Sequence, residues 1–272
     1  MESRQLKKSP LIVSVVRDFS MYCKCISENP VCDDCEKWFF DNRIDSKHIP
    51  VWYNRALSVV DESTSRWLVF CHEDFMPKES IVACLEHADE NKLYGVIGGV
   101  LLPRKRWLLG GVWGGEFRGK IVESEKDGSS PLIRGLDVPL GTTVDTVDCQ
   151  CLIVHSSLVV KYGLRFDEEL SFDLYAEDFC LGSFLKHGIV TAILPLKCQH
   201  FSRGRLLPRF FDQKSYLDRK YPEAEVQGCV GYTIGGGRTV MRRFQKVMRS
   251  YLDRHMPIVV KWCFALIRYV HL

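Results

Sequence analysis

Two kinds of side chain suited to metal and proton chemistry recur along this chain of 272 residues. In chain order they are His72, Glu73, Asp74, Glu177, Asp178 and His200. Carboxylates are hard oxygen donors that suit Mg²⁺ or Mn²⁺, and an imidazole can complete such a site. A cation held there would bridge two phosphates, while a separate carboxylate takes the proton from an attacking hydroxyl. These residue types therefore predict metal-assisted transfer from a diphosphate donor.

The first three of these residues follow an apolar run, Trp67 to Phe70, that is typical of a strand buried on both faces. Open α/β sheets bind their ligands at the carboxyl ends of such strands, which favours a metal triplet at His72, Glu73 and Asp74. The alternative is a polar turn in which Asp74 caps a helix that begins near Glu79.

Glu177 and Asp178 lie in a predicted helix over 173–186. Adjacent helical residues point in different directions, so we expect one of the pair to be a catalytic base and the other an orienting or capping residue. The alternative is a solvated acidic first turn that complements the helix dipole. For His200 the alternative is a structural or exposed loop histidine.

Strands alternate with helices around these residues, which predicts an α/β domain with a largely parallel sheet and right-handed crossovers. The pattern predicts strands at 11–16, 37–40, 67–70, 94–102, 147–154 and 189–196, and helices at 19–29, 48–60, 79–90, 156–162, 173–186 and 209–220. The Gly-rich segment 103–144 is interpreted as loops and short strands that shape a pocket. We expect one domain over 1–236 and a separate tail over 237–272.

Composition is that of an ordinary globular protein, with 46% hydrophobic and 26% charged residues. The formal net charge of +3 is too small to argue for nucleic acid. Most of the 12 cysteines have apolar neighbours, which predicts reduced thiols in a cytoplasmic protein. Cys23, Cys25, Cys32 and Cys35 are spaced unlike a usual zinc site, so ordinary thiols are favoured over zinc ligands there.

The tail has a different character. Between Gly237 and the end, eight lysines and arginines accompany one acid, Asp253, and the final stretch from Met256 is largely apolar. It is too short and too charged to span a bilayer comfortably. We expect an amphipathic helix that lies peripherally on an anionic membrane, the alternative being a helix packed on the domain or in a dimer.

Over about residues 10–204, the order of these features resembles inverting nucleotide-sugar glycosyltransferases of the GT-A fold, related to glycosyltransferase family 2. The most specific part is Arg165-Phe166-Asp167-Glu168, then Glu177-Asp178, then a strand, then His200. The chain is most similar to a subgroup with a His-Glu-Asp type of triplet where the wider family has Asp-x-Asp. His72 stands where many relatives carry the first aspartate.

This resemblance implies a role for each matching residue. Asp178 matches the catalytic base, with Glu177 before it, and Asp74 matches the last metal-binding aspartate, with His200 and His72 completing the site. The positions implied to lie near the nucleotide are Val16, Asp18, Asp41, Asn54 and Glu73. The cofactor would be Mn²⁺ or Mg²⁺, the donor most often a UDP-sugar bound by the half around 10–102, and the acceptor a surface glycan or lipid-linked hydroxyl bound by the half around 103–204.

Two other classes remain open. A metal-dependent nucleotidyltransferase would want a Gly-rich, basic phosphate loop directly after the first strand, and the sequence there, Arg17 to Ser20, does not supply one. A non-catalytic relative that binds nucleotide or acts as a scaffold would share the same fold, because one fold hosts many functions.

Overall fold

A computed structural model describes residues 8–61, 63, 65–102, 115–202, 206–229, 231–236 and 251. The strands are β1 (Leu11–Val16), β2 (Glu36–Asp41), β3 (Trp67–Cys71), β4 (Phe75–Pro77), β5 (Leu93–Gly95), β6 (Ile97–Leu101), β7 (Gly115–Glu123), β8 (Leu132–Leu136), β9 (Thr143–Val144), β10 (Thr146–Val147), β11 (Cys151–His155), β12 (Thr191–Ile193), β13 (Cys198–His200), β14 (Val226–Gln227) and β15 (Thr233–Ile234). The helices are α1 (Phe19–Tyr22), α2 (Ile49–Leu57), α3 (Ile81–Leu85), α4 (Ser156–Tyr162), α5 (Tyr175–His187) and α6 (Pro208–Lys220), with a π-helical turn η1 (Cys23–Ser27) and a 3₁₀ turn η2 (Pro30–Cys32).

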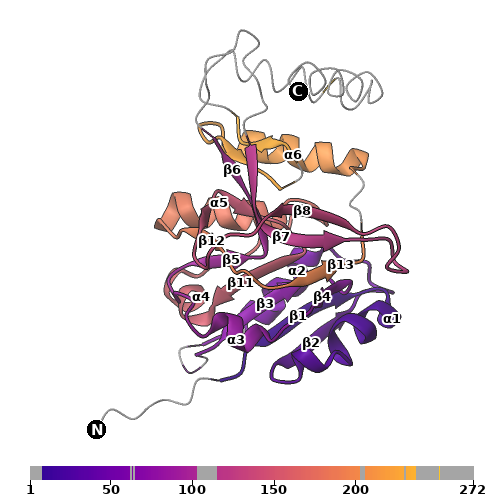
Figure 1. Ribbon diagram of the computed structural model, residues 1–272. Coiled ribbons are helices and arrows are strands. Elements are labelled where there is room, and N and C mark those ends of the chain that lie inside the picture. The colour runs from indigo at the N-terminus through magenta and orange to yellow at the C-terminus, as the bar shows by residue number, and fades with distance from the viewer. Residues whose placement is uncertain are drawn as a thin grey trace.

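The fold is α/β, with mixed sheets flanked by helices (Figure 1). The main sheet has the order β2-β1-β3-β11-β5-β12-β9. Strands β2, β1 and β3 are parallel to one another, as predicted, but β11 runs antiparallel to both of its neighbours and β9 is antiparallel to β12. The prediction of a largely parallel sheet is therefore wrong for the centre of the sheet. Strands from both predicted halves of the domain lie side by side in it.

The reversal at β11 arises in a segment that the pattern predicted to be one strand, 147–154. The chain turns after β10, where the Cys151 N–H donates to the Asp148 carbonyl, and β11 begins at Cys151. Asp148 thus lies in a turn and not in a strand. The predicted strand 94–102 is likewise two strands, because the chain passes at Val96 from β5 in the main sheet to β6 in the second.

The second sheet has the order β10-β6-β7-β13-β4, with β8 paired to β7. Its longest strand, β7, falls in the region predicted as loops and short strands. β13 pairs antiparallel with β4, so that His200 lies opposite Phe75, and parallel with β7. Through this pairing the second sheet brings β13 beside β4, the strand that follows β3 in the chain.

Side chains of β1 alternate between two hydrophobic clusters because a strand presents successive residues to opposite faces. Leu11, Val13 and Val15 face the cluster that includes residues of α2 and α5. Ile12 and Val16 face the other cluster, which includes residues of α1 and α3. Burial on both faces explains why β1 is a continuous apolar run.

Several local predictions change in the structure. The helix predicted over 79–90 is the short α3, and its N-cap is Ser80, whose hydroxyl accepts the Ala83 N–H. The alternative in which Asp74 caps that helix is therefore wrong. Cys23, Cys25, Cys32 and Cys35 are free thiols, and no metal-ligating group of the described residues includes them.

The predicted tail, 237–272, lies outside the described residues except for Tyr251. None of the helices in the described part of the chain has the length and apolar character needed to span a bilayer.

Candidate functional site

A tight turn after β3 carries the first metal-ligand candidates. β3 ends at Cys71, the Phe75 N–H donates to the His72 carbonyl, and β4 begins at Phe75. The neighbouring β13 ends at His200, and the Phe201 N–H donates to the Asp74 carbonyl. The β4–β13 register therefore places His200 beside Asp74, although 126 residues separate them in the sequence.

His72, Asp74 and His200, which we call the metal group, each offer one ligand atom, and these atoms lie within 4.8 Å of one another. His200 Nε2 is 3.2 Å from Asp74 Oδ1, and the two imidazole rings are 5.9 Å apart between centroids. Two imidazole nitrogens and one carboxylate oxygen at this spacing can coordinate a transition-metal ion. The metal-binding expectation for these three residues thus has a geometric basis.

A buried nitrogen of His200 that lacks a hydrogen-bond partner among the described residues also fits a metal ligand. His200 is 8% exposed, its Nε2 lies beside Asp74 Oδ1, and its Nδ1 has no hydrogen-bond partner in the described structure. Buried polar atoms are usually satisfied, so a histidine in this state is suited to bind a ligand. Burial raises the pKa of Asp74, but the charge of His200 and its hydrogen bond outweigh burial and bring that pKa to about 2, so the carboxylate is ionised.

Tyr175 fixes the tautomer of His72. The Tyr175 hydroxyl lies 2.8 Å from the Cys149 carbonyl and 2.8 Å from His72 Nε2. Because the carbonyl can only accept, the tyrosine proton goes to it and the hydroxyl oxygen accepts from His72 Nε2–H. The Nδ1 lone pair of His72 then remains for a metal, an arrangement common among metal-ligating histidines. Burial lowers the pKa of His72 to about 4, so the ring is neutral, as a ligand must be.

Glu73, predicted near both metal and nucleotide, is bound to the main chain that follows the neighbouring strand β1. Its carboxylate accepts the backbone N–H of Arg17, just after β1. This bond joins the ends of two neighbouring strands, and Glu73 is not part of the metal group.

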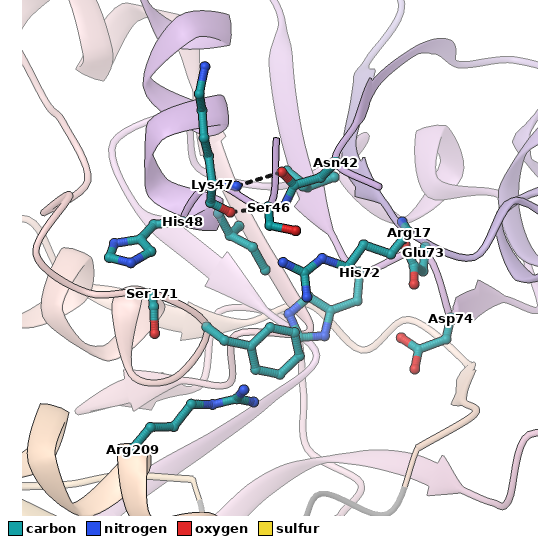
Figure 2. Close-up of a pocket in the computed structure, with 13 residues that line it drawn as sticks. Arg17, Asn42, Ser46, Lys47, His48, His72, Glu73, Asp74, Ser171 and Arg209 are labelled. Carbon is teal, nitrogen blue, oxygen red and sulfur yellow. Dashed lines mark hydrogen bonds between the residues drawn. The ribbon is translucent and has the colours of Figure 1, made fainter. Parts of the chain in front are cut away.

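A pocket of about 230 Å³ lies at the carboxyl ends of β1, β2 and β3, on one side of the metal group (Figure 2). Arg17 and Arg209 reach into it from different walls, so we call it the arginine pocket. Asn42 shapes the upper wall by accepting the Lys47 N–H and donating to the Lys47 carbonyl. Guanidinium groups bind phosphate oxygens in bidentate fashion, so this pocket suits a phosphorylated ligand next to a metal.

Of the residues predicted to lie near the nucleotide, Glu73 lines this pocket, whereas Val16, Asp18 and Asp41 do not. Val15, Arg17 and Asn42 line it, whereas Val16 is buried in the cluster on the opposite face of the sheet. Asp18 caps α1 by accepting the Met21 N–H. The exposed Asp41 pairs with Arg43, its carboxylate 2.7 Å from the guanidinium.

Asn54, predicted to lie near the nucleotide, is hydrogen-bonded to a distant segment of the chain. Its amide accepts the Phe166 N–H and donates to the Phe166 carbonyl and to the Glu168 carboxylate, each at 2.9 Å. It joins α2 to the segment before α5 and is not among the residues that line the arginine pocket.

A second pocket, of about 400 Å³, lies on the other side of the metal group and shares His72, Asp74 and Phe172 with the first. We call it the acidic pocket, because its charged lining is Asp74, Glu123, Asp148, Asp173, Glu177 and Arg134. Glu177 is buried there, and the Cys149 thiol donates to its carboxylate over 3.2 Å. Burial, and then the charge of Asp148, raise the pKa of Glu177 to about 8.

Asp178 lies on another side of α5. Its carboxylate accepts from Lys220 at 2.7 Å and from the Tyr221 hydroxyl at 2.8 Å. It lines a separate pocket that contains none of the metal group. The structure thus places Glu177 in the pocket that the metal group also lines, and leaves Asp178, the predicted base, in an ion pair with α6.

Tyr175, Arg17 and Arg209 are functional candidates that sequence reasoning missed. Arg17 directly follows a predicted strand, and that position at the carboxyl end of a strand could have identified it as a ligand-binding candidate. Tyr175 is two residues before Glu177, but nothing in its sequence surroundings indicates a contact with His72. Arg209 begins a helix predicted as merely polar, and its position depends on tertiary packing.

Comparisons with known proteins give little more. No protein-family model matches the chain, and no curated protein matches it. A solved structure described as "Crystal Structure of A197 from STIV" is similar at 15% sequence identity over 83% of this chain and 93% of that chain, with a TM-score of 0.40. A likeness of that size supports no conclusion about fold family or function.

Proposed function

We propose that this chain is a divalent-cation-dependent inverting glycosyltransferase of the GT-A type, acting on a nucleotide-diphosphate sugar. The observation that carries the proposal is the position of the metal group between an arginine pocket and an acidic pocket. A transferase needs that order, with the donor diphosphate on one side of the cation and the acceptor hydroxyl on the other.

His72, Asp74 and His200 are the proposed ligands, and a bound cation would neutralise charge on the leaving diphosphate. Two imidazoles and one carboxylate favour Mn²⁺ over Mg²⁺, although the same set also binds Fe²⁺ and Zn²⁺. Arg17 and Arg209 would hold the phosphate oxygens, and Tyr175 would keep the His72 ring in the ligating tautomer.

We assign the base to Glu177 in place of Asp178. Glu177 lines the pocket that adjoins the metal group, and its raised pKa suits a group that takes a proton near neutral pH. Asp178 already accepts from Lys220 and Tyr221, which leaves it poorly placed to meet an acceptor hydroxyl.

The test is nucleotide release from a panel of nucleotide sugars, UDP-sugars first, with Mn²⁺ present. The wild-type chain should release nucleotide from at least one of them. Glu177→Gln should lower that rate by about 10²–10⁴-fold, the usual contribution of a general base. Asp178→Asn, a matched change at the next residue, should keep most of the activity.

Two results would count against the proposal. Absence of release from every nucleotide sugar would favour a non-catalytic protein. Loss of activity in Asp178→Asn but not in Glu177→Gln would return the base to the residue that the sequence resemblance implies.

A further inference from the structure

Strand β2 forms the outer edge of the main sheet, and its far side meets no other strand of the described structure (Figure 1). We propose that this edge binds β2 of a second copy of the chain, in antiparallel orientation, about a twofold axis at Phe39. The inference does not rest on the proposed function, because no residue of β2 lines the arginine pocket or the acidic pocket.

The backbone of β2 is oriented for pairing on its free side. The N–H groups of Glu36 and Asn42 donate to the carbonyls of residues 10 and 16, so the even-numbered residues of this strand bond to the β1 side. Backbone groups of alternate residues point to opposite edges of a strand. The outward N–H and C=O groups, which a further strand would bind, are therefore those of Lys37, Phe39 and Asp41.

Large apolar side chains lie exposed along the same edge. Phe39 is 48% exposed and Trp38 is 37% exposed, and as successive strand residues they lie on opposite faces. The Phe39 ring is held against Phe19 and Tyr22, at centroid distances of 5.2 and 5.4 Å. An edge strand with exposed hydrophobic side chains is a surface suited to pair with another chain.

Charge complementarity identifies a second copy of the same strand as the partner. With the axis at Phe39, Lys37 of each copy lies opposite Asp41 of the other, and Trp38 of each copy lies opposite Phe40 of the other. Opposite charges and aromatic pairs directly across antiparallel strands both stabilise the pairing. Because the Phe39 N–H and C=O point outward, the two copies of this residue can exchange both of their backbone hydrogen bonds.

Neighbouring registers lose this match. An axis at Lys37 sets two lysines against each other, and an axis at Phe40 sets Lys37 opposite Arg43. An axis at Trp38 sets Lys37 opposite Phe39 and pairs no charges within the strand. Like charges directly opposite each other are destabilising, so the register centred on Phe39 is favoured.

The lysine of β2 does not block the edge. Lysines on edge strands commonly prevent pairing, but the Lys37 ammonium group turns back toward the segment before β2. Its Nζ lies 3.1 Å from the Ser27 carbonyl oxygen and 3.2 Å from the Asp33 carboxylate. The outward backbone groups are thus left uncovered, while the positive charge stays on the residue that faces Asp41 of the second copy.

Sedimentation equilibrium of the full chain measures the association. The mass of the wild type should rise with concentration from 31.3 kDa toward twice that value. Asp41→Lys sets two lysines opposite each other, and Lys37→Glu sets two carboxylates opposite each other, so each should raise the dissociation constant at least about tenfold. Asp137→Lys is the control, because it makes the same charge change at an exposed aspartate that pairs with Lys120 after β8, and it should leave the constant unchanged.

Mixing the Asp41→Lys and Lys37→Glu chains separates the register from effects on folding. In the mixed pair each introduced charge faces an opposite charge, so the two variants should associate with each other within about threefold of the wild-type affinity. Three results would overturn the proposal: a wild type that stays monomeric, a dimer that persists unchanged in both variants, or a mixture that associates no better than either variant alone.

Hydrogen exchange of the wild type, followed at single residues by NMR, locates the interface. Protection of the Lys37, Phe39 and Asp41 amides should increase with protein concentration, because the second copy covers only the outward groups. The Trp38 and Phe40 amides already bond to β1 and should change little. Concentration-dependent protection in β8 instead of β2 would place the interface on the second sheet and contradict the proposal.

Discussion

Burial and charge place two adjacent carboxylates of α5 in different chemical states. Glu177 is enclosed beside a thiol and near Asp148, and its pKa is raised to about 8. Burial also raises the pKa of Asp178, but Lys220 partly restores its charge through an ion pair at 2.7 Å. Successive helical residues are about 100° apart, so a helix that presents one to a pocket turns the other away.

The resemblance implied Asp178 as the base with Glu177 beside it, whereas the geometry leads us to propose Glu177 as the base. The direction of each side chain depends on how α5 begins. Leu174, just before the helix, has a φ of 64° in the left-handed region, which a non-glycine residue adopts at a cost of about 1–3 kcal/mol. No sequence signal marks Leu174 as such a position, so the phase of the helix could not be predicted.

Tyr175→Phe is the sharpest residue-scale test of the metal group. It removes one hydroxyl, so that His72 Nε2–H and the Cys149 carbonyl lose their partner. Because orienting partners of metal-ligating histidines typically contribute 10–100-fold, Mn²⁺ affinity should fall by about that factor. Titration calorimetry with Mn²⁺ measures it.

Tyr94→Phe is the matched control, since its hydroxyl accepts the Asp89 N–H at 2.8 Å and has no hydrogen bond to the metal group or to Tyr175 among the described residues. Equal Mn²⁺ affinity in the wild type and in Tyr175→Phe would show that the tautomer of His72 is not set by this tyrosine.

At the scale of elements, the site depends on a pairing that no local pattern reveals. The apolar run of β3 was predicted as a strand, and the polar residues after it as a metal triplet, with a turn as the alternative. β4 and β13 each have three residues, and their antiparallel register is what brings His200 to Asp74. Short strands carry too little periodicity to show their partner, so residue types and the resemblance, and not a predicted strand pairing, linked these two residues.

The face that a strand presents to a ligand was also beyond the sequence. β1 is apolar at nearly every position because both faces are buried, so the pattern does not show which residues point to which face of the sheet. The resemblance implied Val16 near the nucleotide, whereas Val15 lines the arginine pocket. A difference of one residue moves a strand side chain to the opposite face.

Asn54→Ala tests an element-scale assignment that differs from the sequence prediction. The side chain joins α2 to Phe166 and Glu168, so its loss leaves a backbone N–H and carbonyl without their partner. We expect the free energy of unfolding to fall by roughly 1–3 kcal/mol, the usual cost of unsatisfied buried groups. Urea denaturation followed by tryptophan fluorescence measures it.

UDP affinity in folded Asn54→Ala should equal that of the wild type, because Asn54 does not line the arginine pocket. A loss of UDP binding with unchanged stability would instead support the role that the resemblance implies.

Across the whole molecule, the α/β class and the order of its principal elements were predictable, because apolar runs and helical periods report burial directly. Strand direction was not. An apolar run looks the same in either direction, and the orientation of β11 depends on the turn between Val147 and Cys151. The two pockets were also unpredictable, since each takes residues from segments far apart in the chain.

The two sheets contribute to different sides of the site. Three parallel strands end at the arginine pocket, the second sheet contributes β7, β8 and β13 to the acidic pocket, and the metal group lies where the two pockets adjoin. In Figure 1, α6 runs above β8, and from this helix Arg209 reaches the arginine pocket while Phe210 lines the acidic one.

The most direct test of the account is calorimetry with UDP, in Mn²⁺ and in EDTA, on the wild type, Asp74→Asn and the surface control Asp127→Asn. We expect Mn²⁺ to tighten UDP binding at least about tenfold, or 1.4 kcal/mol, in the wild type and in Asp127→Asn. Asp74→Asn should lose that gain and retain the weaker affinity measured in EDTA. Equal UDP affinity with and without Mn²⁺ in the wild type would contradict a cation held by His72, Asp74 and His200 on a diphosphate.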